Sequence, residues 1–391
     1  MKERYEQLDA LRGLAALTVL FSHLAMTPAN VPPLVHQFLY RAYSPFSILI
    51  KGHQAVFFFF VLSGFVLSLP LLRGSKLNYT GYLIRRFCRI YIPYILAFGI
   101  GLFLLTSAPK FTSASLADII NNMWTQDLST SDVLNHVYGI VSFDSRLVNG
   151  VIWTLVHEMR ISIVFPFVVL LLMNLRWYYS IVAAVILSAV EALNFVFHFQ
   201  KPIEGLDISY FDSLHFLSFF IFGMVLAKHR HQLANKFSQL SRNKKIGLLL
   251  LGFVCYNYSV YPLRAMKELG IELPYQFIFG DYINAVGICI FITAALASRK
   301  IGSLLTGRLP IFLGNVSYSL YLYHLVIMLA LIHHFLGKIS LVSLLGITLV
   351  LSLLVAYLGY VLVEKPSIVL GKKLTQRIGK KEKRKPHSTA A

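Results

Sequence analysis

The sequence predicts an all-α, polytopic integral membrane protein, a bundle of about ten transmembrane helices with both termini in the cytoplasm. Hydrophobic residues make up 57% of the 391 residues, charged residues only 14%, and the mean hydropathy is +0.66. Soluble domains carry about 25% charged residues, so a chain this apolar needs the bilayer as its solvent. The apolar residues also gather in segments of about 20, the length that crosses the hydrocarbon core.

The chain begins with the charged stretch MKERYEQLD. The apolar run after it lacks a small-residue cleavage site, which predicts a first span rather than a signal peptide. Nine more apolar runs follow, many with aromatic residues at their ends, as is typical of the membrane interface. The predicted spans are 10–27, 54–72, 90–107, 151–173, 178–199, 208–228, 246–263, 280–298, 309–334 and 340–363.

Two segments are predicted to lie outside the spans. The longest link, 108–149, contains LADIINNMW, for which we expect a short interfacial helix. Residues 371–391 are basic and poor in apolar residues, so they are predicted to be a disordered cytoplasmic tail attracted to anionic membrane lipids. Residues 1–370 then form one membrane domain.

The basic residues set the predicted orientation. The chain has 36 Lys and Arg against 17 Asp and Glu, a net charge of +19. With ten spans, 26 of the 36 fall on one side and 8 on the other, while Arg12 and Arg160 lie inside spans. The positive-inside rule therefore places both termini in the cytoplasm. Because topology explains the excess, no nucleic-acid partner is expected.

The three cysteines, Cys88, Cys255 and Cys289, are far apart in the sequence. This spacing excludes a disulfide scaffold and any CxxC metal or redox site, and no metal is expected.

Ionisable residues inside the spans indicate a functional site, since a charge near the bilayer centre costs roughly 2.5–3.5 kcal/mol on insertion scales. In the first span Arg12 and His23 are eleven residues apart, about three helical turns, so they share a face with Asp9. Glu158 in the fourth span lies ~10 Å below the outer edge of the membrane, and His23 lies at a similar depth. The two could therefore meet.

His23 and Glu158 are the predicted catalytic residues. An imidazole can take a proton from a nucleophile, and a carboxylate can orient it or stabilise its charged form. His324 in the ninth span reaches a similar depth, and catalytic and packing roles are equally open for it. For Glu191 in the fifth span a packing role is favoured, in which a neutral carboxyl bonds a neighbouring helix.

Three arginines precede the third span. Arg85 and Arg86 are four and three residues before Arg89, so the three guanidinium groups can crowd one helical face. Positive-inside anchoring explains this cluster as well as an anion site does, although Arg forks suit phosphate oxygens. In the second span, Ser63 and Gly64 allow either close helix packing or room for a thin ligand.

Together these segments resemble the acyltransferase family 3 of multi-spanning membrane proteins, which O-acylate cell-surface carbohydrates and related acceptors. The similar segments are LDALRGLAALTVLFSH, GHQAVFFFFVLSGFVL, RRFCRIYIPY, WTLVHEMRISIVFP, LGNVSYSLYLYHL and VEKP, spread over about residues 7–366. The chain departs from the family pattern at Gly52-His53-Gln54, where Gly-Val-Asp is usual, and at Thr154, where Ser is common.

The resemblance implies an acyltransferase of the cell (inner) membrane that moves an acyl group, with acetyl favoured, from acyl-CoA. The implied acceptor is a hydroxyl of a cell-surface or exported carbohydrate or of a lipid-linked glycan. The resemblance maps His23 and Arg12 onto essential residues of the family and Glu158 onto its conserved acid. The predicted acyl-donor residues are Arg12, Ser63, Arg85, Arg86 and Arg89.

Another class of function stays open. In a proton-coupled transporter or lipid-carrier flippase, the embedded His, Glu and Arg would form a proton relay. The sequence has no pair of broken helices in matched halves, which weighs against this alternative. A non-catalytic sensor or scaffold is the least favoured, because it gives the buried ionisable residues no role.

Overall fold

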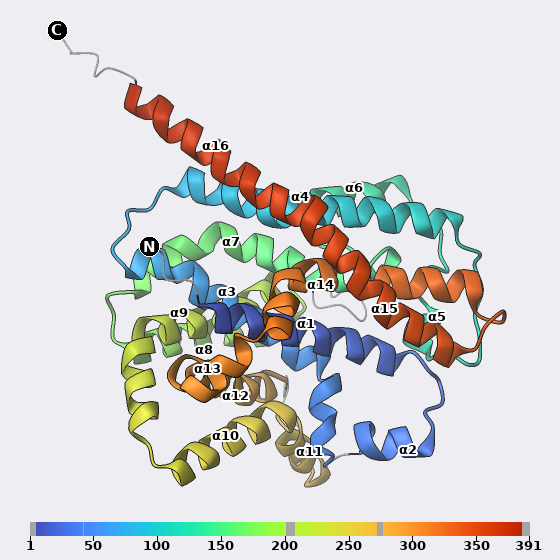
Figure 1. Cartoon of the computed structure of the whole chain (residues 1–391), viewed down its shortest axis with the longest axis horizontal. Helices are drawn as coiled ribbons and strands as arrows, with labels where there is room; N and C mark the ends of the chain where they lie inside the picture. The colour runs from blue at the N-terminus through green and yellow to red at the C-terminus, as the bar shows by residue number, and fades with distance from the viewer. Residues whose placement is uncertain (1–4, 42, 201–207, 272–276, 385–391) are drawn as a thin grey trace.

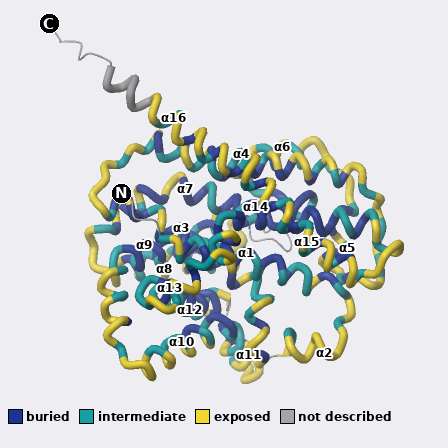
Figure 2. Tube along the Cα trace, viewed as in Figure 1, coloured by how far each residue is buried: buried dark blue, intermediate teal, exposed yellow. Residues whose placement is uncertain are grey.

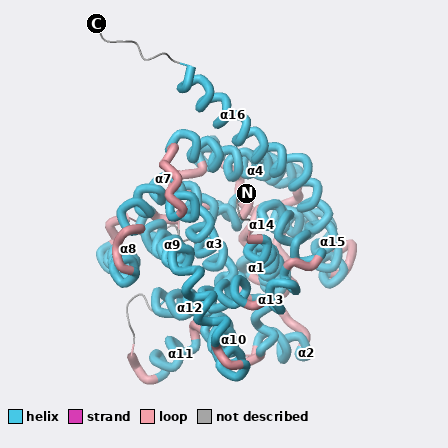
Figure 3. Tube along the Cα trace, turned by 60° about the vertical axis from the view of Figure 1, so that its left-hand side comes forward, coloured by secondary structure: helices cyan, strands magenta, loops and turns pink. Residues whose placement is uncertain are grey.

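The computed structural model describes residues 5–41, 43–200, 208–271 and 277–384 of the chain, without the side chains of 378–384. Within these ranges every regular element is a helix (Figure 3). Nine helices are long and apolar enough to cross a membrane, or ten when one bent helix pair counts as a span. The predicted all-α membrane bundle is therefore confirmed for this part of the chain.

The spanning helices follow the predicted order (Figure 1). They are α1 (Glu6–Met26), α3 (Gly52–Leu72), α4 (Tyr79–Ser107), α7 (Trp153–Leu172), α8 (Trp177–Phe197), α9 (Tyr210–Gln239), α12 (Phe277–Ala297), α14 (Arg308–Phe335) and α15 (Leu341–Gly359). The last span continues through a π-helical turn, Tyr360–Glu364, into α16 (Lys365–Arg384).

Three predicted spans differ clearly from the helices of the structure. Helix α4 begins at Tyr79, about a dozen residues early, because the side chain of Asn78 caps it by accepting from the Gly81 amide at 2.7 Å. Helix α9 continues to Gln239 rather than ending near 228. The predicted seventh span is the bent pair, α10 (Arg242–Asn257) and α11 (Tyr261–Glu268), which meet at 60°.

The C-terminal segment also differs from the prediction of a tail without structure. Helix α16 continues to Arg384, because its Lys, Arg, Gln and Leu residues are good helix formers. The helix packs along α4, and a methyl group at Gly371 would lie 3.1 Å from the Cβ of Cys88. Residues 385–391 of the predicted tail lie outside the described residues.

Glycines allow two pairs of helices to cross with their backbones in contact. A methyl group at Gly64 of α3 would lie 2.1 Å from the carbonyl oxygen of Phe220, and one at Gly223 of α9 only 2.0 Å from that of Val61. Gly13 and Gly314 bring α1 against α14 in the same way. Small residues at helix crossings permit such approaches in membrane proteins.

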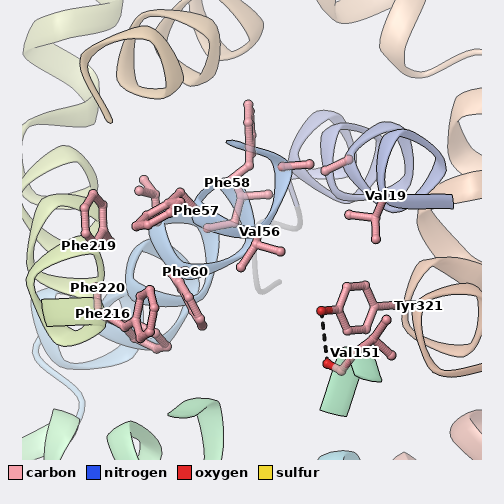
Figure 4. Packing of buried hydrophobic residues seen from close by; sticks show 14 of the residues in the cluster. Val19, Val56, Phe57, Phe58, Phe60, Val151, Phe216, Phe219, Phe220 and Tyr321 are labelled. Carbon is pink, nitrogen blue, oxygen red and sulfur yellow. Dashed lines mark hydrogen bonds between the residues drawn. The ribbon is translucent and has the colours of Figure 1, made fainter. Parts of the chain in front are cut away.

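Aromatic residues fill the space beside the α3–α9 crossing (Figure 4). Phe57 and Phe60 of α3 face Phe216 and Phe219 of α9, with centroid distances of 4.4 Å for Phe57–Phe219 and 4.9 Å for Phe60–Phe216. These rings belong to the main buried cluster of the bundle, whereas the outer surfaces of α8, α10 and α15 are largely exposed (Figure 2). The crossing thus lies within the main buried core of the bundle.

The α3–α9 crossing yields a stability prediction. Gly223→Ala should destabilise the protein by at least about 1–3 kcal/mol, the usual range for overpacking, because the added methyl group meets backbone atoms that cannot move alone. Thermal unfolding of the detergent-purified protein measures this as a lower Tm. Gly99→Ala is the matched control, since no atom lies within 4 Å of its Cβ position. Equal unfolding temperatures for the two variants would contradict the packing argument.

The link between α4 and α7 covers the end of the bundle opposite the termini (Figure 1). It contains α5 (Asp118–Asn121), inside the predicted interfacial segment, and α6 (Thr130–Tyr138). The indole of Trp124 donates to the carbonyl of Val148 at 2.9 Å. The buried ring of His136 stacks on Phe98 at 5.0 Å, and burial lowers the pKa of His136. The link is therefore packed onto the bundle.

Candidate functional site

A cavity of about 850 Å³ lies among α1, α3, α4, α7, α14 and the junction of α15 with α16. This volume falls within the usual range of ligand pockets. Its lining includes Ser75 and Lys76 of the α3–α4 link, Asp9 at the start of α1, and Lys372 of α16. The cavity therefore opens towards the side of the bundle where α1 and α4 begin.

The lining is strongly basic. Seven cationic side chains contribute to it, Arg12, Lys76, Arg85, Arg86, Arg89, Lys365 and Lys372. Three acidic side chains contribute as well, Asp9, Glu158 and Glu364. The formal charge of the lining is thus +4, and its walls, built of Leu, Val, Phe and Tyr side chains, strengthen the attraction for an anion by excluding water.

All five predicted donor residues line this one cavity, and so does Glu158. Arg86 is held most firmly. Its guanidinium lies 2.7 Å from Oε1 of Glu158, and its Nε donates to Oγ of Ser162 at 3.0 Å. Ser63 reaches the same carboxylate oxygen at 3.4 Å. Ser63 therefore makes a polar contact at the cavity wall.

Arg12 is positioned where α1 crosses α14. Its Nε donates to Oγ of Ser317 at 2.9 Å, and its Nη2 donates to the carbonyl of Gly314 at 3.3 Å. Asp9, one turn earlier in α1, lies 3.4 Å away, as their shared helical face predicts. These contacts fix the guanidinium at the cavity wall.

Arg89 differs from Arg12 and Arg86. It is partly buried and lines the cavity, yet it makes no hydrogen bond or ion pair with any residue that the structure describes. Glu364 and Glu158 attract Arg89 only at longer range, and Oε2 of buried Glu364 accepts from Oγ of Ser319 at 3.0 Å. A partly buried cation without a direct partner favours an anionic ligand at this point of the cavity.

His23 lies beside His324, outside the cavity lining. Nδ1 of His23 is 3.0 Å from the carbonyl of Val19 and 3.2 Å from Nε2 of His324. Nδ1 of His324, which is fully buried, lies 2.9 Å from the carbonyl of Leu320. Carbonyls only accept hydrogen bonds, so each Nδ1 carries the proton in the neutral rings.

This pattern defines which atom of His23 is available for chemistry. Nε2 of His324 has no proton and accepts from His23, so Nε2 of His23 keeps a free lone pair. That nitrogen has no partner among the described residues, and it is the atom that can take a proton. His324, which the sequence leaves undecided, thus contacts the predicted catalytic histidine and sets its tautomer.

His23 and Glu158 make no hydrogen bond with each other. Glu158 is bonded to Arg86 and Ser63, whereas His23 is bonded to His324. Tyr321 lines the cavity with Glu158, and its ring centroid is 6.1 Å from that of His324. The predicted meeting of His23 and Glu158 is therefore not accompanied by a hydrogen bond, and any action of Glu158 on His23 must be indirect.

Tyr321 is itself fixed at this wall. Its hydroxyl lies 2.8 Å from Oγ1 of Thr154 and 3.2 Å from the carbonyl of Val151 (Figure 4). Thr154, the departure from the family pattern, keeps a hydroxyl where serine is common. The ring therefore has a fixed position at the cavity wall, next to His324.

Several cavity residues were missed from the sequence. Glu364 lies in the VEKP segment, which could have pointed to it. Ser162, which binds Arg86 but does not line the cavity, lies one turn after Glu158 and was also missed. Lys76, Lys365 and Lys372 gave no signal, because surface lysines near a span end are typical of positive-inside anchoring. Only the packing of α16 along α4 brings two of these lysines to the cavity.

A second polar cluster, away from this cavity, joins four helices. His215 of α9 lies 3.2 Å from Asp281 of α12 and 3.4 Å from Glu191 of α8. His53, at the start of α3, lies 3.0 Å from the other oxygen of Asp281. Glu191 therefore has the interhelical role that the sequence favours, but it shares it with an acid and two histidines.

This cluster should contribute strongly to stability. Asp281→Ala removes the acid that both His53 and His215 contact, and breaking such a buried pair costs about 3–5 kcal/mol. We expect a marked fall in the Tm of the purified protein. Asp127→Ala is the control, because the Asp127 side chain is 96% exposed in its pair with Lys110 and exposed pairs contribute little. Similar Tm values for the two variants would show that the cluster does not join the helices.

No group of three or more His, Cys, Asp or Glu side chains suited to a metal ion occurs among the described residues. A comparison with protein families matches residues 5–361 to the acyltransferase domain of the acyltransferase 3 family. Neither the curated proteins nor the solved structures contain a match to the chain.

Proposed function

The chain belongs to the acyltransferase 3 family, whose match covers nearly its whole length, and from that premise we propose the reaction that this multi-pass membrane protein catalyses. It transfers an acyl group, with acetyl favoured, from acyl-CoA to a hydroxyl of a cell-surface or exported carbohydrate or of a lipid-linked glycan. The observation that carries this proposal is a cavity of net charge +4 next to a histidine pair with one free lone pair.

The donor suits the cavity by charge. Coenzyme A carries a diphosphate and a ribose 3′-phosphate, about four negative charges near pH 7, which match the +4 of the lining. Arg89 provides a guanidinium with no direct hydrogen-bond partner among the described residues, while Arg12, Arg85 and Arg86 supply further donors to phosphate oxygens. Ser63 lies at the same wall, where its small side chain leaves room for the slender pantetheine arm.

The chemistry requires the thioester to pass Tyr321 and reach His23. Nε2 of His23 takes the proton of the acceptor hydroxyl while its oxygen attacks the thioester carbonyl. The C–O bond forms, the C–S bond breaks, and the thiolate leaves with the proton from His23. The same lone pair would serve a two-step route in which His23 carries the acyl group before the acceptor receives it.

Glu158 acts through Arg86 in this scheme. The carboxylate anchors the guanidinium at 2.7 Å and so orients it towards the donor. The sequence suggested a direct contact between Glu158 and His23, and this role through Arg86 replaces it.

The excess of Lys and Arg in the links on one side of the bundle supports an orientation in the membrane. Both termini and the mouth of the cavity face the cytoplasm, where acyl-CoA is made, and the protein resides in the cell membrane. The acceptor approaches from the other side, where the packed link between α4 and α7 shapes its site. The basic residues of α16 add an attraction for anionic lipids.

Release of free thiol tests the proposal against the transporter alternative. Purified protein is incubated with acetyl-CoA and an extract of cell-surface glycans, and free CoA is measured. Acyl transfer predicts thiol release that depends on both the protein and the extract. A transporter or flippase would instead move solute or protons without consuming acetyl-CoA, and that result would overturn the proposal.

A further inference from the structure

We propose that Lys76, Lys365 and Lys372 form a subsite for the ribose 3′-phosphate of the donor, which lets the protein distinguish CoA from 3′-dephospho-CoA. This inference rests on the proposed function and adds a specificity element to its donor site. None of the three lysines was predicted to take part. All three line the same cavity as the arginines.

One face of α16 forms the wall of the cavity mouth. The four residues of this helix that follow Glu364 and line the cavity are Lys365, Ile368, Val369 and Lys372. They stand at positions i, i+3, i+4 and i+7, the spacing of a single helical face. Two lysines therefore flank an apolar strip that faces the cavity, and the third lysine, Lys76, comes from the α3–α4 link.

The three ammonium groups are available to a ligand. They are exposed, and none makes a hydrogen bond or ion pair within the described parts of the chain. Arg12 and Arg86, deeper in the cavity, are by contrast held by Ser317, Gly314 and Glu158. The lysines thus lie nearer to solvent and have no competing internal partner.

Most of the net positive charge of the cavity lining belongs to the lysines rather than to the arginines. The four arginines of the cavity are largely offset by Asp9, Glu158 and Glu364, which leaves a formal charge of +1. The lysines carry the other +3. Within coenzyme A the 3′-phosphate is a phosphomonoester of charge about −1.5 to −2, the most concentrated charge of the molecule.

The two kinds of cation suit two kinds of phosphate. Guanidinium forks bind the paired oxygens of a diphosphate, whereas the ammonium of lysine acts as a point charge on a flexible stem. A terminal phosphate near the mouth of the cavity can bind the ammonium groups of several lysines, because their flexible side chains can reach it. The three lysines therefore fit the 3′-phosphate, and the arginines of the cavity fit the diphosphate that leads to the pantetheine arm.

Binding, measured apart from turnover, tests this subsite. The Kd values of CoA and 3′-dephospho-CoA are determined by calorimetry on the purified protein and on the triple variant Lys76→Gln, Lys365→Gln, Lys372→Gln. Wild-type protein should bind CoA about 10- to 100-fold more tightly, as expected for hydrogen bonds to a charged group. The triple variant should lose this preference while its Kd for 3′-dephospho-CoA stays nearly unchanged.

Lys373→Gln is the matched control, because this exposed neighbour on α16 does not line the cavity, and it should keep the preference. Equal affinity of wild-type protein for the two ligands would overturn the inference while leaving the acyl-CoA reaction standing. Equal weakening of both ligands in the triple variant would also overturn it, since the lysines would then act only as general attraction. Binding of neither ligand would overturn the inference and the proposed donor together.

Discussion

His23→Ala should lower the rate of acyl transfer by roughly 10²–10⁴-fold, the usual contribution of a general base, while the protein stays folded. The physical reason is the tautomer that the neighbouring groups impose. Val19 and His324 engage Nδ1 of His23, so Nε2 holds the only lone pair of the ring that can take the proton. Alanine removes this acceptor and leaves no other group in its place.

The rate is measured as CoA release and as acyl groups on the glycan, with the elution profile and Tm as tests of folding. His334→Ala is the control, because Nδ1 of His334 also bonds the carbonyl four residues earlier, that of Ala330, and the residue lies away from the cavity lining. It should keep full activity. A His23→Ala protein that transfers acyl groups at the wild-type rate would exclude His23 as the base.

Arg89→Met should weaken donor binding and stabilise the protein without ligand. The guanidinium makes no direct hydrogen bond or ion pair with any residue in the described part of the chain, and only longer-range attraction to Glu364 and Glu158 offsets the cost of its partial burial in the empty protein. Methionine removes that cost and keeps much of the apolar stem. The lost charge-assisted contact should raise the Kd of CoA by about 10- to 100-fold.

Arg86→Met provides the contrast. It also removes a cation from the cavity, but it leaves Glu158 without its ion pair, so both donor affinity and Tm should fall. Calorimetry and thermal unfolding measure the two quantities for each variant. If Arg89→Met lowers the Tm as much as Arg86→Met does, Arg89 has an internal structural role and is not reserved for the donor.

The sequence predicted the spans well because their signal is local. A run of about 20 apolar residues must cross the membrane whatever its neighbours are. The bend after Asn257 and the extension of α16 to Arg384 were missed because they depend on caps and on packing along α4. A basic segment with few apolar residues can be either a solvated tail or a helix packed on the bundle, and its composition does not distinguish the two.

Which site residues share one face of a helix was predictable, but which residues of other helices that face contacts was not. The spacing from Arg12 to His23 correctly placed both on one face of α1, where each contacts α14. Glu158 was predicted to meet His23, yet Arg86 binds the acid and His324 contacts the histidine. Contacts such as His23–His324 join residues 301 positions apart, which a pattern along one helix cannot show.

The central claim is that acyl-CoA is consumed to esterify a carbohydrate hydroxyl at His23. The most direct test uses acetyl-CoA labelled in the acetyl group, with purified protein in vesicles and a glycan acceptor. We expect label on the glycan and free CoA in equal amounts, and neither product with His23→Ala. Label that stays in the thioester while solute or protons cross the vesicle membrane would contradict the account.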